Sequence, residues 1–244
     1  MRRAIPFIAL ILLAAFVLSG FSSQEIVSGR RRSSAAGATV TLVAHAASPC
    51  VITGCSGATS NQVDTTNATA LVACMVSGTN PPTAPTDSKS NSWGTNFYSA
   101  LIIGTTYVGC YIVYSPTTSS THTFTAPGGS TGAYWAWKGT KTSSGVDSGT
   151  FAVNHFAASL TCLPGSVTPS QSGEGLMTVV TFNTQGTTYT IDSGFRSPGD
   201  VATAFSPYVN SSELTDSSSS AVNLTWTGNA SQNLGCSIVG VEHP

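Results

Sequence analysis

From residue 38 onward the chain alternates between short runs of strand-forming residues and clusters of turn-forming residues. In the run at 221–227, Val222, Leu224 and Trp226 would all point to one side, with polar residues between them. This two-residue period is typical of a half-buried strand. Gly- and Pro-containing turns, such as residues 127–129, separate the runs. Beyond the N-terminal segment, no run sustains the 3.6-residue apolar period of an amphipathic helix, so the pattern predicts an all-β fold.

Many short strands joined by Gly-, Pro- and Ser-rich turns are typical of a sandwich of two packed sheets. We therefore predict a single antiparallel β-sandwich of jelly-roll or Ig-like type over residues 37–244. No internal repeat with a fixed period is visible, and no linker divides this region. One domain is the economical interpretation.

The N-terminus has the pattern of an export signal. Arg2 and Arg3 precede the apolar run 4–17, and the segment 18–20 that follows contains the small residues Ser19 and Gly20. The apolar run is shorter than the roughly 20 residues of a membrane-spanning helix. We therefore expect a helical signal peptide at 1–20, a flexible leader at 21–36 and no stable membrane insertion. The expected location is secreted or on the cell surface, with the periplasm as an alternative.

Charge is scarce, which excludes one class of partner. Only 8% of the residues are charged, and the formal net charge is −1. Proteins that bind nucleic acid do so largely by neutralising phosphates with Lys and Arg. We expect no nucleic-acid partner.

Six cysteines in an exported chain are candidates for disulfides. Cys50 and Cys55 flank a short segment, and their pairing is the one we expect first. Cys74, Cys110 and Cys236 lie in apolar runs, where a buried free thiol competes with a disulfide. No C-x-x-C spacing occurs and the histidines are scattered, so we expect neither a metal site nor a cofactor.

Several turn and strand-edge segments occur in a familiar order. They are residues 57–66, 87–93, 121–125, 165–170, 191–195 and a strand that contains Trp226. Over roughly residues 39–241 this order resembles a β-sandwich module of exported bacterial proteins and some phage structural proteins. The resemblance implies the fold and says little about activity. The six cysteines depart from it, and a signal peptide conflicts with a virion role, because virion proteins assemble in the cytoplasm.

Catalytic motifs are missing from the sequence. No G-x-S-x-G elbow occurs, and His45, His122 and His155 have no neighbouring acid that would orient them. Glycosidase chemistry needs two carboxyl groups about 5 to 10 Å apart, and Glu174 and Glu213 are the glutamates well inside the domain. We predict no catalytic residues and no enzymatic activity.

Calcium is a weak alternative for the aspartates. Asp64, Asp87, Asp147 and Asp192 each lie beside Ser, Thr or Gly, as turn-forming aspartates do. A site built from some of them lacks the spaced run of acids of a known calcium loop.

Aromatic residues are the candidate ligand site. Trp135 and Trp137 are two residues apart, so both project from one face of a strand, and Tyr98 could extend the same platform. Flat aromatic faces in a row are what a sugar-binding surface needs. The alternative is that the two tryptophans fill the sandwich core, as alternating large residues on a strand usually do.

These observations lead to one main functional hypothesis. We expect a secreted or cell-surface β-sandwich without catalysis that binds a partner, with a glycan or another cell-surface polymer as candidate, or that has a structural role. The alternatives are an extracellular hydrolase acting on polysaccharide and a phage-type virion structural or adhesion component. The oligomeric state is left open.

Overall fold

The computed structural model describes residues 39–48, 57–78, 80–94, 96–182, 187–192, 194–195, 200–202, 208–215 and 218–244. The predicted signal peptide, the predicted leader and the predicted Cys50–Cys55 pair lie outside these ranges. Every regular element in them is a strand. Among the described residues, no helix has the length and hydropathy needed to cross a membrane.

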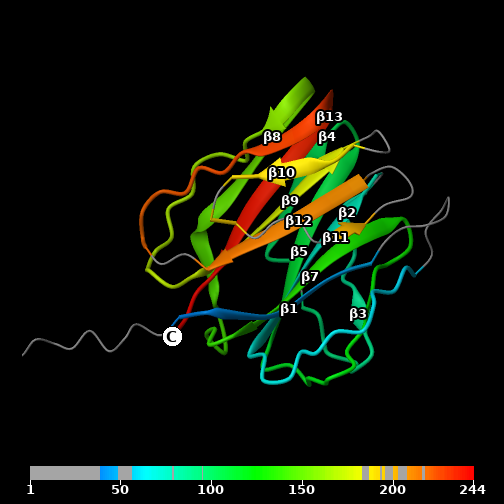
Figure 1. Cartoon of the computed structure of the whole chain (residues 1–244). Helices are drawn as coiled ribbons and strands as arrows, with labels where there is room; N and C mark the ends of the chain where they lie inside the picture. The colour runs from blue at the N-terminus through cyan, green and yellow to red at the C-terminus, as the bar shows by residue number, and fades with distance from the viewer. Residues whose placement is uncertain are drawn as a thin grey trace, which may run out of the picture. The chain divides into compact units, whose positions relative to one another are not determined.

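The strands fall into two consecutive groups (Figure 1). The first group is β1 (Thr41–Ser48), β2 (Ala70–Ser77), β3 (Thr86–Asp87), β4 (Tyr98–Ile103), β5 (Thr106–Tyr114), β6 (Phe124–Thr125) and β7 (Ser130–Lys138). The second group is β8 (Val146–Cys162), β9 (Gly175–Phe182), β10 (Tyr189–Ile191), β11 (Asp200–Ala202), β12 (Tyr208–Thr215) and β13 (Trp226–Val241).

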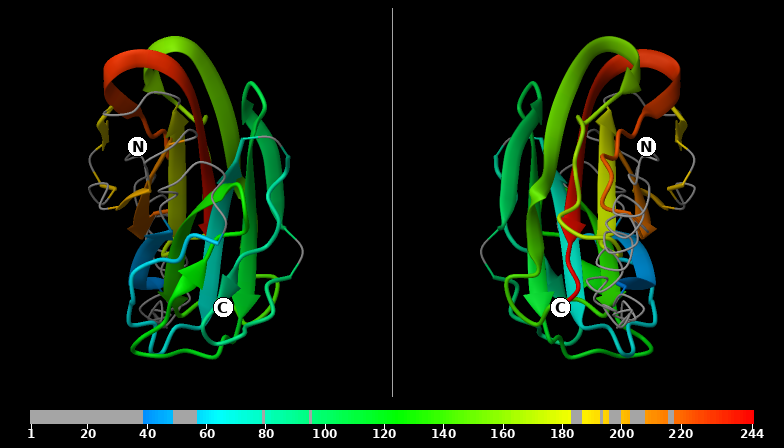
Figure 2. Two further views of the ribbon diagram at one scale, coloured as in Figure 1. Left: turned by 90° about the vertical axis from the view of Figure 1, so that its right-hand side faces the viewer. Right: turned by 90° about the vertical axis from the view of Figure 1, so that its left-hand side faces the viewer.

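The long strands of each group build one antiparallel sheet, and the two sheets pack face to face as the two layers of a sandwich (Figure 2). The short strands β3 and β6 of the first group pair with each other in a separate two-stranded sheet. The first sheet has the order β1-β7-β2-β5-β4. In the second sheet the path β10-β13-β9-β12-β11 is joined by β8, which pairs with β13. The predicted antiparallel β-sandwich is therefore confirmed. The described chain passes between these two sheets once, whereas an Ig-like chain passes between them repeatedly.

The two sheets repeat one topology. In each, the first long strand lies at one edge, the last inserts beside it, and the second strand is central: β1-β7-β2-β5-β4 corresponds to β8-β13-β9-β12-β11. The short β3 pairs with β6 as β10 pairs with the start of β13. Both halves are therefore variants of one unit, although the sequence shows no repeat of fixed period.

The registers of the central strands agree residue by residue. Ala70 faces Tyr114 on one side and Trp137 on the other, and Gly175 likewise faces Thr215 and Val241. Eight consecutive pairs continue from these positions in all four ladders. Ala70 and Gly175 are therefore equivalent positions of the two halves.

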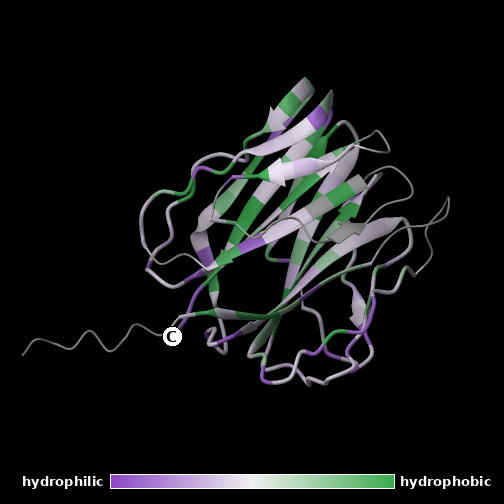
Figure 3. Ribbon diagram, viewed as in Figure 1, coloured by the Kyte–Doolittle hydropathy of each residue, from purple (hydrophilic) through white to green (hydrophobic). Residues whose placement is uncertain are grey.

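Apolar residues from the two inner faces form the central core. The first sheet contributes Val72, Cys74, Val76, Trp135 and Trp137, and the second contributes Met177, Val179, Val239 and Val241. Neither sheet can bury this face alone, so Ala38–Pro244 form one compact unit. In Figure 3 the hydrophobic residues concentrate in the strands and many hydrophilic residues lie in the loops.

The outer faces of the sheets are covered as well. Leu71, Ala73 and Met75, on the outer side of β2, form a cluster with Phe124 and Tyr134. On the second sheet a corresponding outer cluster forms around Phe182, Tyr189 and Trp226. Both central strands, β2 and β9, are therefore buried along their whole length. Neither strand alternates between buried and exposed side chains, because long connecting segments cover both outer faces.

The long strands β8 and β13 arch together over one end of the fold (Figure 2). Their register shifts between Thr227 and Leu234, and Ala158 has a positive φ of 49°. Such irregularities bend a strand pair. In the strand ladder Cys162, at the end of β8, is paired with Trp226, at the start of β13, on one side of the bend. Its disulfide, however, is with Cys236, which lies on the other side of the bend and is paired with Asn154. This disulfide therefore closes the arch.

The second described disulfide links the central strands of the first sheet. Cys74 and Cys110 face each other across β2 and β5, and their sulfurs are bonded. In the second half the equivalent positions are Val179 and Ser211. The alternative of buried free thiols at Cys74, Cys110 and Cys236 is therefore wrong.

Candidate functional site

The candidate platform is not on the surface. Trp135 and Trp137 are both 0% exposed and belong to the core between the sheets. The Trp135 indole donates to Glu213 Oε2 at 3.2 Å, and Trp137 Nε1 lies 3.1 Å from Met177 Sδ. The expectation that they form a sugar-binding surface is therefore wrong, because their shared face is the inner face of the sheet.

Tyr98 lies at the edge of the same core. Its ring stacks on Phe151 with centroids 5.4 Å apart. Its hydroxyl is buried and has no hydrogen-bond partner among the described residues. Burial raises the pKa of Tyr98 to about 12. Tyr98 therefore packs between the sheets and does not extend an exposed platform.

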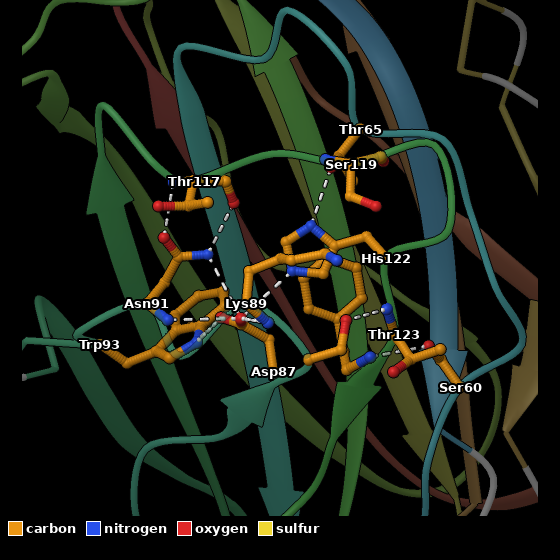
Figure 4. Close-up of polar contacts among 12 residues, drawn as sticks. Ser60, Thr65, Asp87, Lys89, Asn91, Trp93, Thr117, Ser119, His122 and Thr123 are labelled. Carbon is orange, nitrogen blue, oxygen red and sulfur yellow. Dashed lines mark hydrogen bonds and ion pairs between the residues drawn. The ribbon is translucent and has the colours of Figure 1, made fainter.

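A buried histidine–carboxylate pair stands under the loops that cover the first sheet (Figure 4). His122 Nε2 lies 3.2 Å from Asp87 Oδ1, and His122 Nδ1 is 2.8 Å from Thr65 Oγ1. Neither the imidazole nor the carboxylate is exposed. Thr65, Asp87 at the end of β3, and His122 come from three separate segments, and Thr65 and His122 are 57 positions apart in the chain.

Asp87 is the hub of this cluster (Figure 4). It accepts hydrogen bonds from the Lys89 and Asn91 amides at 2.8 and 3.3 Å and from the Trp93 indole at 2.7 Å. Burial by itself would raise the pKa of Asp87, but the bonds from His122, Lys89, Trp93 and Asn91 together lower it. The carboxylate is fully engaged in joining the loops, which is a structural role.

A second histidine, His45 on the edge strand β1 of the first sheet, contacts β12 of the second sheet. His45 Nε2 is 3.0 Å from Ser211 Oγ, and His45 Nδ1 is 3.1 Å from Glu213 Oε2. The His45 ring stacks on Trp135, with centroids 5.2 Å apart and planes 6° from parallel. The serine, imidazole and carboxylate follow one another in the order of a hydrolase triad.

The triad geometry lacks the other parts of a hydrolase site. Ser211 is 1% exposed, so a substrate carbonyl cannot reach its hydroxyl. It lies inside β12, paired with Val179 on one side and Asp200 on the other, where no sharp turn presents it. The three side chains instead connect β1 to β12 across the sandwich.

Three carboxylates converge at the ends of β8 and β13 that lie away from the arch. Asp147 is at the start of β8, Glu174 precedes β9 and Glu242 follows β13. One ligand atom from each lies within 4.8 Å of those of the other two. The side chains of Glu174 and Glu213 make their described contacts in different clusters, so these two glutamates do not form a glycosidase pair.

The environment of Glu174 disfavours its charge. Burial first, and then the approach of Asp147, raises the pKa of Glu174 to about 7, although hydrogen bonds from Ser170 and the Gln171 amide oppose this. Its Oε1 accepts both bonds, at 2.9 and 3.0 Å.

An open groove lies beside this end of β8. Its volume is about 540 Å³, within the range of small-molecule sites. Apolar side chains line it together with hydroxyl groups: Phe97, Ile112, Tyr114 and Val146, with Ser92 and Ser144. The Gly145 amide donates to the Tyr114 hydroxyl at 2.8 Å, which fixes this ring in the wall.

Comparison of the chain with protein-family models, with curated proteins and with solved structures found no match.

Sequence reasoning missed the two histidine clusters and the acidic cluster for one reason. Their members are far apart in the chain, for example 166 positions between His45 and Ser211. The serine–acid spacing of Ser211 and Glu213 on one strand face was a signal, because residues two apart on a strand project together. The acidic cluster had no such signal.

Proposed function

We propose that the chain is an exported, non-catalytic β-sandwich protein that acts by binding a ligand of glycan type in the groove beside Phe97 and Tyr114. The observation that carries this proposal is the groove itself. Its walls combine apolar side chains with hydroxyl groups. Sugars present C–H faces and hydroxyl groups, and such mixed sites accommodate them.

Absence of catalysis is supported by the burial of the histidine clusters. His122 and Asp87 are sealed under loops, and Ser211 is inaccessible inside β12. A general base needs to reach the proton it removes from a substrate. The described histidine–acid contacts instead join the loops or the sheets.

Export is supported by the two disulfides. Cys74–Cys110 and Cys162–Cys236 bond all four described cysteines. Disulfides form and persist in oxidising compartments outside the cytoplasm.

A polysaccharide pull-down with the purified protein tests the proposal. Gly94 lines the groove, and a Cβ built on it meets no atom within 4 Å. Gly94→Trp therefore fills the groove from an unstrained position. The matched control is Thr190→Trp, which places the same side chain at an exposed position on β10 of the other sheet. We expect retention of the wild type and the control on at least one insoluble or cell-wall polymer, and loss of retention for Gly94→Trp.

Two results would contradict the proposal. If the wild type is retained on no polymer, the protein does not bind a glycan of the panel. If Gly94→Trp is retained as well as the wild type, the glycan binds outside the groove.

The second candidate function, a hydrolase, is favoured by one observation. Ser211, His45 and Glu213 have the interatomic distances of a triad. This candidate requires movement of β12 or β1 that exposes Ser211, and it predicts covalent labelling of this serine.

A further inference from the structure

The acidic cluster is special to the second half of the fold. Because Gly175 is equivalent to Ala70, Glu174 is equivalent to Thr69. By the same registers Glu242 is equivalent to Lys138. Where the second half has the acids Glu174 and Glu242, the first half therefore has a hydroxyl group and a cation, those of Thr69 and Lys138. The shared fold does not require carboxylates at these positions.

Most carboxylate oxygens in the cluster have donors. Asp147 accepts from the Gly149 amide and the Ser170 amide, each at 2.8 Å. Glu242 pairs with Lys141 through one oxygen and accepts from the Ser170 hydroxyl at 3.2 Å through the other. That same hydroxyl also lies 2.9 Å from Glu174 Oε1, so its single proton serves two acids.

One oxygen stands apart from this pattern. Glu174 is 0% exposed, and its Oε2 has no hydrogen-bond partner in the described part of the chain. A buried unpartnered carboxylate oxygen is costly, because burial removes the water that would otherwise solvate it. Glu174 lies in the group whose ligand atoms converge within 4.8 Å, with Asp147 and Glu242 as the other members. Lys141 is the cation in contact with the group, and its described ion pair is with Glu242.

We propose that Asp147, Glu174 and Glu242 bind a hard divalent cation, with calcium preferred. Calcium binds carboxylate oxygens at 2.3–2.6 Å, so two oxygens on one ion lie at most about 5 Å apart. The separations in the cluster meet this limit. Magnesium, at 2.0–2.1 Å, would need all the oxygens within about 4.2 Å. This proposal departs from the sequence-based expectation of no metal, and it is independent of glycan binding.

The bound ion would join three chain segments that are not neighbours in sequence. Asp147 lies at the start of β8, the first strand of the second sheet, Glu174 immediately precedes β9, and Glu242 immediately follows β13. Ser144 and Val146 in the groove wall lie three residues and one residue before Asp147. The ion would therefore fix the start of β8 against the rest of the second sheet.

Thermal unfolding of the purified, oxidised protein tests the site. After removal of divalent ions with EDTA, calcium is added up to about 10 mM, since extracellular calcium sites have dissociation constants of roughly 0.1–1 mM. Sodium chloride at about 30 mM matches the ionic strength and controls for screening. A ligand at 100 times its dissociation constant stabilises a chain of this size by about 5 to 10 °C in Tm, and about half of this at tenfold excess.

Glu174→Gln and Asp64→Asn form the matched pair of variants. Both remove one negative charge, but Asp64 is exposed and lies outside the group that converges on Glu174. We expect the calcium-dependent rise in Tm to be lost in Glu174→Gln and retained in Asp64→Asn. An absent rise, a rise equal to that in sodium chloride, or an unchanged rise in Glu174→Gln would overturn the proposal.

Terbium luminescence tests the site in the wild-type protein, so its result does not depend on whether a variant folds. Terbium replaces calcium at oxygen sites and is excited by a nearby indole. The Trp137 ring packs against Gly175, the residue after Glu174, where a Cβ would lie 3.0 Å from the ring. Terbium emission from the wild-type protein that calcium displaces is the expected result, and no emission on indole excitation would overturn the site.

Discussion

Removal of the Cys162–Cys236 disulfide should release the arch of β8 and β13 while the rest of the sandwich stays folded. The perturbation is the double variant Cys162→Ala/Cys236→Ala. Its matched control is Cys74→Ala/Cys110→Ala, which removes the disulfide between directly facing residues of β2 and β5. All four cysteines are buried, so the lost packing of the sulfur atoms is similar in the two variants.

The magnitude follows from the length of chain that each disulfide closes. The sequence separations are 74 for Cys162–Cys236 and 36 for Cys74–Cys110. The chain-entropy relation then gives losses of about 4.5 and about 3.8 kcal/mol in the free energy of unfolding. With a urea m-value of about 2.5 kcal/mol/M, the midpoint should fall by about 1.8 M and about 1.5 M.

Urea titration measures the loss in the free energy of unfolding, and amide hydrogen exchange shows which strands lose protection. In Cys162→Ala/Cys236→Ala we expect protection to fall first at Trp226 and in β10, beyond the bend, because the disulfide holds this part against the sheet. In the control, the hydrogen-bonded ladders on both sides of β2 persist. A loss below about 1 kcal/mol, or equal exchange at both ends of the arch, would refute the reasoning.

Three further predictions concern buried polar groups and close approaches. Asp87→Asn should lower the free energy of unfolding by about 1–3 kcal/mol in a urea titration, because the indole and imidazole groups around it lose a charged acceptor. A change below about 0.5 kcal/mol would contradict the role of Asp87 as the hub of its cluster. In metal-free buffer, stability should fall as the pH rises from 4.5, the ordinary pKa of Glu174, to about 7, its pKa in the folded protein. The folded state binds more protons than the unfolded chain in this window, so a Glu174→Gln variant with an unchanged slope would contradict the assignment. Gly235→Ala should cost about 1–3 kcal/mol, since its Cβ would lie 2.7 Å from the Ile102 carbonyl oxygen of the facing sheet, whereas Gly94→Ala, with open space around it, should be nearly neutral in the same melt.

Strand periodicity and turn chemistry were enough to predict the sandwich, because they depend on local residues. The repeated topology was not predictable in the same way. The equivalent strands share few identities: Tyr107-Val108 and Tyr208-Val209 are one pair at matching registers. Equivalent positions need only similar size and polarity to keep a register, so Cys110 in one half is Ser211 in the other.

The two tryptophans show what strand periodicity leaves undetermined about the faces of a strand. The two-residue spacing correctly places Trp135 and Trp137 on one face of β7, since both belong to the same inner core. The period alone does not say whether that face is inner or outer. Here even the outer face is covered, because Tyr134 and Ala136 pack under the loops of the first sheet.

The candidate sites depend on contacts that no local pattern encodes. Asp147, Glu174 and Glu242 meet because three strand ends coincide in space, and strand ends coincide only once the register of the second sheet is known. From the sequence, Asp147 was one of four aspartates considered for a calcium site, but no local pattern placed the two glutamates beside it.

We propose that the protein acts by binding and that its buried Ser211–His45–Glu213 network has a structural role. Labelling of the native, purified protein with a fluorophosphonate probe, followed by peptide mapping, tests this claim most directly. We expect no label on Ser211, since its hydroxyl is sealed inside β12 and β1. Stoichiometric labelling of Ser211 in the wild type that disappears in His45→Gln would show an activated nucleophile and contradict the account.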